Sequence, residues 1–133
     1  MIVLDEQLLG RGLERHIAHW YRGAVCYVTD LRPNTVIKDD VIPHLLQQEN
    51  QPTFVTINEK DFWRKVAINE RFCVVCFVLP DSRVPEISPS LRLILSLPLF
   101  KTKRARMGCV IRVSEQEASY YTCDDKRART VDL

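Results

Sequence analysis

The sequence has no long apolar run and no strong imbalance of charge, and these two absences exclude several classes of protein. No stretch approaches the roughly 20 consecutive apolar residues that cross a bilayer. Lysine and arginine number 19 against 17 aspartates and glutamates, and a net charge of +2 does not by itself indicate nucleic-acid binding. Asp5 and Glu6 stand where a secretory signal would be basic and then apolar. We therefore expect a cytoplasmic protein with no membrane-spanning segment.

The sequence also lacks the spacing of a disulfide framework. It has five cysteines, an odd number, and most of them lie in apolar, strand-like runs. Cys73 and Cys76 form a C-x-x-C pair, but residues three apart in an extended strand point to opposite faces. Buried free thiols are therefore expected, and not a metal or redox pair. A glycine-rich phosphate loop and a serine nucleophile elbow are absent as well.

What the sequence does contain is an alternation of strand-like and helix-like segments within one domain of 133 residues. Five apolar segments predict strands at residues 2–4, 24–28, 53–57, 72–79 and 109–113. Helical segments between them predict an α/β fold with a mostly parallel five-stranded sheet, because parallel strands need such crossovers. The last strand is expected at an edge, with a domain over residues 1–123 and a flexible tail over 124–133.

Four helices are expected between these strands. The first has apolar residues at helical spacing, Leu9, Leu13, Ile17 and Trp20, and ends near Gly23. The second begins at Asp39 or Asp40, since Pro43 is tolerated only in a first turn. A short third helix is expected over residues 66–68. In the fourth, Ser88 is expected to be the N-cap and Pro89 the first helical residue, with an apolar run up to Leu97.

Acidic side chains follow two of the predicted strands and open one of the predicted helices. Asp5 follows the first strand, Asp39 and Asp40 stand at the second helix, and Asp61 follows the third strand. Carboxylates gathered at one edge of a sheet repel one another unless a cation lies among them, and oxygen ligands favour Mg²⁺ or Mn²⁺. The alternative interpretation is local, with Asp61 as a helix cap and Asn58 as part of a turn.

Three motifs, IVLDEQL, KDDVI and FVTINEKDF, occur in an order and at separations that resemble those of PIN-like nucleases. The closest resemblance is to the minimal bacterial branch, whose members often stand beside an antitoxin. The resemblance covers about the first two thirds of the chain. It implies a Rossmann-like three-layer α/β fold and a divalent-metal site that cuts RNA.

Carried over residue by residue, the resemblance gives Asp5, Asp39 and Asp61 as metal ligands. Asp40 is the neighbouring candidate, and spacing does not choose between it and Asp39. Glu6 and Asn58 are auxiliary candidates; Asn58 either holds a water or, as we favour, makes the turn.

The chain departs from the family pattern at two acidic positions. Glu59 stands where the minimal branch has a second aspartate, and its side chain is one methylene longer. Larger members have a fourth acid near the following strand, and Asp81 is the only candidate in this sequence that stands at a suitable position. Both are kept as auxiliary candidates.

These observations predict a Mg²⁺- or Mn²⁺-dependent ribonuclease that hydrolyses RNA with a metal-activated water, as the toxin of a toxin-antitoxin pair. The alternative is a catalytically degenerate PIN-like module that binds a protein partner. The apolar residues 91–99 predict a homodimer, because such a surface needs cover.

A short basic segment precedes the last predicted strand. Lys101, Lys103, Arg104 and Arg106 place four cations in six positions. If this segment borders the acidic site, it would contact RNA phosphates; otherwise it is a solvated connection. His16 and His19 lie three apart on the first helix, but no third ligand follows them, which favours an ordinary surface helix.

Overall fold

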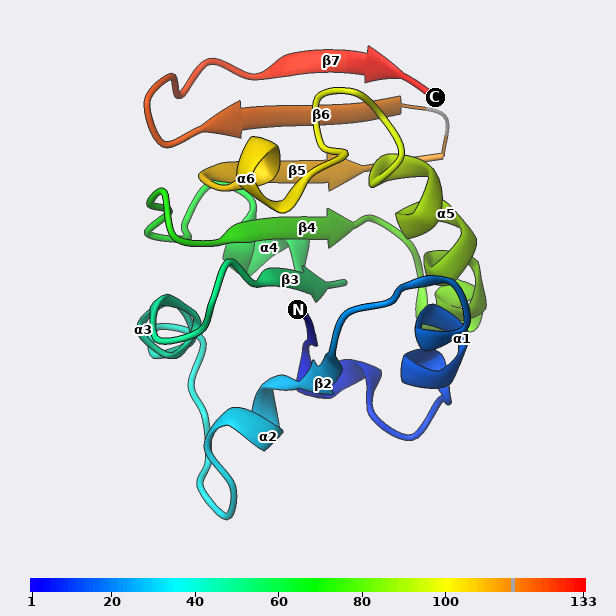
Figure 1. Cartoon of the computed structure of the whole chain (residues 1–133), viewed down its shortest axis with the longest axis vertical. Helices are drawn as coiled ribbons and strands as arrows, with labels where there is room; N and C mark the ends of the chain where they lie inside the picture. Colours follow the sequence, from blue (N-terminus) through cyan, green and yellow to red (C-terminus); the bar gives the residue numbers. More distant parts are fainter. Residues whose placement is uncertain (116) are drawn as a thin grey trace.

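The computed structural model describes residues 1–115 and 117–133, which form one seven-stranded mixed sheet with helices around it (Figure 1). The strands are β1 (Ile2–Leu4), β2 (Val25–Tyr27), β3 (Thr53–Thr56), β4 (Cys73–Phe77), β5 (Cys109–Val113), β6 (Glu117–Thr122) and β7 (Arg129–Asp132). The helices are α1 (Leu13–Trp20), α2 (Val28–Leu31), α3 (Ile42–Gln47), α4 (Glu59–Phe62), α5 (Ile87–Ile94) and α6 (Lys103–Arg106), with two 3₁₀ turns, η1 (Glu6–Leu8) and η2 (Asp81–Glu86).

The order of the strands in the sheet is β2-β1-β3-β4-β5-β6-β7. The five predicted strands are the first five in this order, and they pair with one another in parallel. The prediction of a five-stranded sheet is nevertheless wrong, because β6 and β7 extend it by two antiparallel strands. β5 therefore lies inside the sheet, and residues 129–132 form a strand where a flexible tail was expected.

The core consists of two clusters that alternate along the central strands. Ile2 and Leu4 belong to the first cluster and Val3 to the second, so successive side chains of β1 enter opposite clusters. Buried residues of α1 and α5 complete the first cluster, whereas residues of α3 and α4 complete the second. The central strands are covered on both faces, which explains why their sequences are continuously apolar.

Helix α1 begins at Leu13, four residues after the expected start at Leu9. Gly10 and Gly12 have φ angles of 77° and 70°, a left-handed conformation that cannot continue a right-handed helix. Helix α3 begins at Ile42, so Asp39 and Asp40 lie in the turn before it. Pro43 occupies the first turn of α3, as its missing amide requires.

The third and fourth predicted helices correspond to α4 and α5, and both begin before the expected residues. Helix α4 directly follows β3, ahead of the predicted residues 66–68. Helix α5 begins at Ile87, so Ser88 is a helical residue and not the N-cap. The buried Ser88 hydroxyl accepts a hydrogen bond of 2.9 Å from Trp20 Nε1, which ties α5 to α1. Among the described residues, no helix has the length and apolar character that crossing a membrane requires.

We predict that Phe54→Ala destabilises the protein by about 3–5 kcal/mol, because it empties a fully buried site in the second cluster. The Phe54 ring packs against Phe62 of α4 with 5.2 Å between centroids, so the loss also loosens α4. Chemical denaturation followed by circular dichroism measures the change. Val36→Ala, at a position that is 85% exposed, is the control and should change stability by less than about 0.5 kcal/mol.

Candidate functional site

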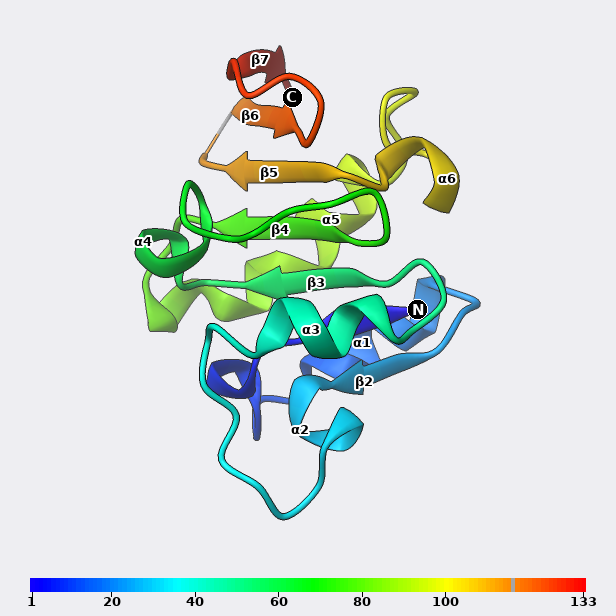
Figure 2. The ribbon, with the colours of Figure 1, turned by 90° about the vertical axis from the view of Figure 1, so that its left-hand side faces the viewer.

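The acidic residues gather at the carboxyl ends of β1 and β3, in the middle of the parallel part of the sheet. The chain passes from β1 to β2 on one side and then to β3 on the other side of β1, so these two strands form a switch point in the topology. In open α/β sheets, ligands bind outside the carboxyl ends of strands at such a point. Figure 2 shows α4, which contains Asp61, at this end of β3.

Asp5 lies directly after β1 and is only 3% exposed. Its Oδ1 accepts a hydrogen bond of 2.8 Å from the Glu6 amide, and its Oδ2 accepts one of 2.6 Å from the Thr56 hydroxyl. Burial raises the pKa of Asp5, the two hydrogen bonds oppose this, and the charges of Asp39 and Glu6 raise it further. Asp5 is thus a fixed carboxyl group in a negative environment.

Asp39 and Asp61 come together through the side chain of Asn58. The Asn58 amide nitrogen Nδ2 lies 2.7 Å from Asp61 Oδ2 and 3.4 Å from Asp39 Oδ2. Burial, the charge of Asp61 and a hydrogen bond with its carboxyl raise the pKa of Asp39, with smaller contributions from Glu6 and Asp40. Asn58 therefore links two aspartates, a role that the turn interpretation did not include.

Asp39, Asp40 and Asp61 line an acidic cavity of about 380 Å³. The other lining residues are Pro43, Phe62, Lys65, Val66 and Ala67. Asp5 does not line the cavity, but it lies near enough to Asp39 for that charge to raise its pKa. Within residues 1–115 and 117–133, no ion pair neutralises Asp5, Asp39 or Asp61.

Two auxiliary acids are engaged elsewhere. Glu59 Oε1 forms an ion pair of 3.0 Å with Arg112 Nε of β5. Asp81 is bound by Arg11, whose guanidinium contacts both the carboxylate, at 3.0 Å, and the backbone carbonyl. These cations compete with any metal for the two carboxylates, so the structure supports neither as a ligand.

The oxygen ligands of the site suit a hard divalent cation, although they are few. In the described part of the chain, no three acidic, histidine or cysteine side chains are arranged to hold a metal ion. Asp39 and Asp61 provide two unneutralised carboxyl groups, and Mg²⁺ is commonly held by one or two carboxylates together with water and substrate phosphates. Burial raises the pKa of Asp39 most, and the neighbouring charge of Asp61 adds to it; a bound cation would offset that second contribution.

The basic segment lies at the amino ends of the strands, whereas the acidic cavity lies at their carboxyl ends. The segment therefore does not border the acidic cavity. Arg106 Nε donates a hydrogen bond of 2.8 Å to Thr53 Oγ1, at the start of β3. Figure 2 shows α6 at the amino ends of β3, β4 and β5, with α4 at their carboxyl ends. The condition for phosphate contacts beside the acidic site is therefore not met. Arg104 lies apart from Lys101, Lys103 and Arg106, in a different hollow.

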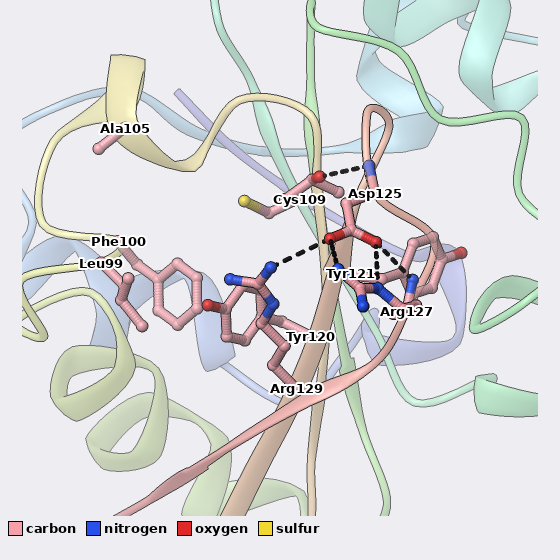
Figure 3. Close-up of a pocket in the computed structure, with 10 residues that line it drawn as sticks. Leu99, Phe100, Ala105, Cys109, Tyr120, Tyr121, Asp125, Arg127 and Arg129 are labelled. Carbon is pink, nitrogen blue, oxygen red and sulfur yellow. Dashed lines mark hydrogen bonds and ion pairs between the residues drawn. The ribbon is translucent and has the colours of Figure 1, made fainter.

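A further cavity, of about 220 Å³, lies between residues 99–105 and the last two strands (Figure 3). Both arginines of this cavity are already paired, because Asp125 contacts Arg127 at 3.2 Å and Arg129 at 3.0 Å. Hydrogen bonds from Arg127 lower the pKa of Asp125 to about 2. The shared carboxylate reduces the attraction of the two arginines for another anion.

The five cysteines are free thiols, as expected. Cys73 belongs to the first core cluster and Cys76 to the second, which confirms that the pair points to opposite faces. Burial raises the pKa of both thiols well above the ordinary value, so they are poor nucleophiles and metal ligands.

Sequence reasoning missed three residues that shape the site: Thr56, Lys65 and Arg112. Thr56 orients Asp5, and its position at the end of a strand beside the acids was a usable signal. Arg112 pairs with Glu59 across 53 residues of sequence, and no local pattern reports such a pair.

Protein-family models, curated proteins and solved structures give no match to this chain. The functional interpretation therefore rests on the residues and geometry described above.

We predict that Asp5→Asn makes the metal-free protein more stable at neutral pH. Folding raises the pKa of Asp5 above its value in the unfolded chain, about 3.9. The protonated carboxyl group therefore stabilises the fold fully at a pH below the unfolded pKa. This stabilisation is lost as the pH rises through the higher pKa of the folded state. At about pH 7.5 the unfolding temperature of the variant should be about 3 °C higher than that of the wild type. This is the shift that a gain of roughly 1 kcal/mol in the free energy of unfolding produces. The difference should shrink toward about pH 4.

Thermal unfolding in EDTA, followed by circular dichroism across this pH range, measures the difference. The exposed Asp40→Asn is the matched control, because it removes a nearby carboxylate while the buried Asp5 carboxyl group stays in place. An Asp5→Asn variant that is less stable than the wild type at every pH would show that the carboxylate is not under strain.

Proposed function

We propose that this protein is a PIN-like, metal-dependent endoribonuclease of the Rossmann-like three-layer class. The observation that carries the proposal is the convergence of Asp39 and Asp61 on one cavity, beside Asp5, with none of the three in an ion pair within the described residues. Three motifs that resemble the minimal PIN-like branch supply these same residues. The substrate class is RNA, and the resemblance adds a small antitoxin as the inhibiting partner.

In this proposal Asp39 and Asp61 hold Mg²⁺ or Mn²⁺ in the acidic cavity, with Asp5 behind them. The ion, when bound, supplies an activated water and neutralises the negative charge that develops at the phosphate. Asn58 donates hydrogen bonds to both aspartates and so fixes their oxygens toward each other. Lys65 lines the same cavity, where its ammonium group would attract an RNA phosphate.

Asp5 acts as a fixed negative charge and not as a mobile base in this proposal. The Thr56 hydroxyl and the Glu6 amide hold both of its oxygens, and its burial excludes bulk water. Each oxygen keeps a further lone pair for an ion or its water. Asp39 and Asp40 both line the cavity, but the Asn58 side chain contacts Asp39, so we assign the ligand to Asp39.

A second candidate is a catalytically degenerate module that binds a protein partner. The ion pairs of Glu59 with Arg112 and of Asp81 with Arg11 favour it, because they remove two acids from the family's constellation. The exposed Leu93 and Leu99, on and after α5, give such a partner, or a second copy of the chain, apolar side chains to contact.

We predict that purified protein cleaves single-stranded RNA in Mg²⁺ or Mn²⁺ and stops in EDTA. Asp39→Asn and Asp61→Asn should each lower the rate by about 100-fold or more, because each removes one of the two carboxylates that face the cavity. Gel analysis of a labelled oligoribonucleotide measures the rate. Asp40→Asn is the matched control on the adjacent residue and should cleave nearly as fast as the wild type. A folded Asp61→Asn protein with unchanged cleavage would refute the assignment.

Calorimetric titration with Mn²⁺ separates the two candidate functions. The nuclease requires saturable binding that weakens at least about tenfold in Asp61→Asn, since losing one of two charged ligands costs more than 1.4 kcal/mol. A wild-type protein that binds no Mn²⁺ at millimolar concentration would favour the degenerate module.

A further inference from the structure

A second cavity, at the amino ends of the strands, has the opposite charge to the acidic cavity. It measures about 420 Å³, and we call it the basic cleft. It is lined by Trp20, Tyr21, Arg92, Leu95, Ser96, Lys101, Lys103 and Arg106. The residues come from the end of α1, from α5 and the two residues after it, and from Lys101 and α6, three parts of the chain that meet only in the fold.

The basic cleft contains four cationic side chains and no acidic one. None of Arg92, Lys101, Lys103 and Arg106 takes part in an ion pair within the described part of the chain. This distinguishes the cleft from the cavity in Figure 3, where both arginines already pair with Asp125. Cations that share a concave surface without counter-charges raise the local concentration of anions.

Arg106 gives the cleft a rigid binding group. Its side chain is buried, at 2% exposure, and is held by bonds of 2.8 Å from Nε to Thr53 Oγ1 and 3.1 Å from Nη1 to the Phe100 carbonyl. These two bonds use Nε and Nη1 and leave Nη2 without a protein partner in residues 1–115 and 117–133. Because Arg106 lines the cleft, its guanidinium is placed to donate to an anion there.

The aromatic residues of the cleft are also fixed in place. Trp20 is held by its bond to Ser88, and its ring meets Tyr21 edge to face with 6.1 Å between centroids. A Cβ at Gly23 would lie only 2.7 Å from the Tyr21 ring, so glycine lets the chain pass close against that ring. A half-buried aromatic pair beside cations matches a ligand that has both a phosphate and a planar base.

We propose that the basic cleft binds a phosphorylated nucleotide, with its phosphate on Arg106, Lys101 and Lys103 and its base against Trp20 and Tyr21. The cavity is of the size that small ligands occupy. Buried Arg106 forms the base of the phosphate subsite, whereas the flexible lysines close around it. This site is separate from the acidic cavity, and its occupancy requires no metal.

The fluorescence of Trp20 tests the proposal directly. The chain has two tryptophans, and Trp63→Phe leaves Trp20 as the only one. Titration of this protein in EDTA with adenosine monophosphate should change the emission saturably, with adenosine and inorganic phosphate each binding at least about tenfold more weakly. Equal binding of inorganic phosphate, or no response to millimolar adenosine monophosphate, would overturn the proposal.

Lys103→Gln in the Trp63→Phe protein should weaken the binding of adenosine monophosphate about tenfold, because it removes one charge-assisted contact. Arg104→Gln is the matched control: it removes the same charge from the next residue of α6, outside the cleft, and should leave the affinity within about twofold. Equal weakening by both variants would show a general effect of charge and would refute a built site.

A 5′-phosphorylated and a 5′-hydroxyl oligoribonucleotide identify the source of the nucleotide. Tight binding of the phosphorylated form alone indicates an RNA end, whereas binding of adenosine monophosphate but neither oligonucleotide indicates a free nucleotide; both outcomes support the proposal. Because the titrations contain EDTA, their result is independent of whether the acidic cavity cleaves RNA.

Discussion

The register of β1 against β3 is the constraint on which the site depends. Leu4 pairs with Val55, so the next residues along the two strands are Asp5 and Thr56. The Thr56 hydroxyl donates a hydrogen bond to Asp5, and its oxygen accepts one of 2.9 Å from the backbone nitrogen of Asn58. Asn58 then reaches Asp61 and Asp39. A slip of one residue would turn each of these side chains to the other face of the sheet and disperse the group.

The cavities at the two ends of the parallel sheet have charged side chains of mainly opposite sign, although the whole chain is nearly neutral. Acids collect where β1 and β3 end, and the cations of the basic cleft collect where these strands begin. Within the described residues Asp5, Asp39 and Asp61 form no ion pair, and neither do the cations of the basic cleft. Burial, and then the neighbouring carboxylates, raise the pKa of Asp5 and Asp39 at the acidic end. Proteins keep such unfavourable arrangements where binding requires them, because a neutral, well-paired surface would be more stable.

The parts of the fold that side-chain burial decides could be predicted from the sequence. The five parallel strands are buried on both faces, so segments such as residues 73–77 are apolar throughout and their place was evident. β7 could not be predicted in this way, because it is held by backbone pairing to β6 and only Val131 is half-buried. The starts of α1 and α3 were missed because left-handed glycines and a turn outweighed the apolar spacing.

The candidate site shows the same division. The resemblance of the motifs gave Asp5, Asp61 and either Asp39 or Asp40 as candidates, and the structure places these residues at the same end of the sheet. The partners of Glu59 and Asp81 come from distant segments, and the end of the sheet that the basic segment reaches depends on the path of the chain. These contacts are properties of the tertiary structure, which no local pattern contains.

The two outermost strands, β2 and β7, leave one backbone edge each without a neighbour in the described sheet. Such edges are places where a foreign strand can join and begin an aggregate. β2 has three residues and β7 four, with Arg129 and Asp132 at the ends of β7, so both offer little length for cross-chain pairing. The antiparallel strands β6 and β7 thereby cover the edge of β5, a mostly apolar strand that another chain could otherwise pair with.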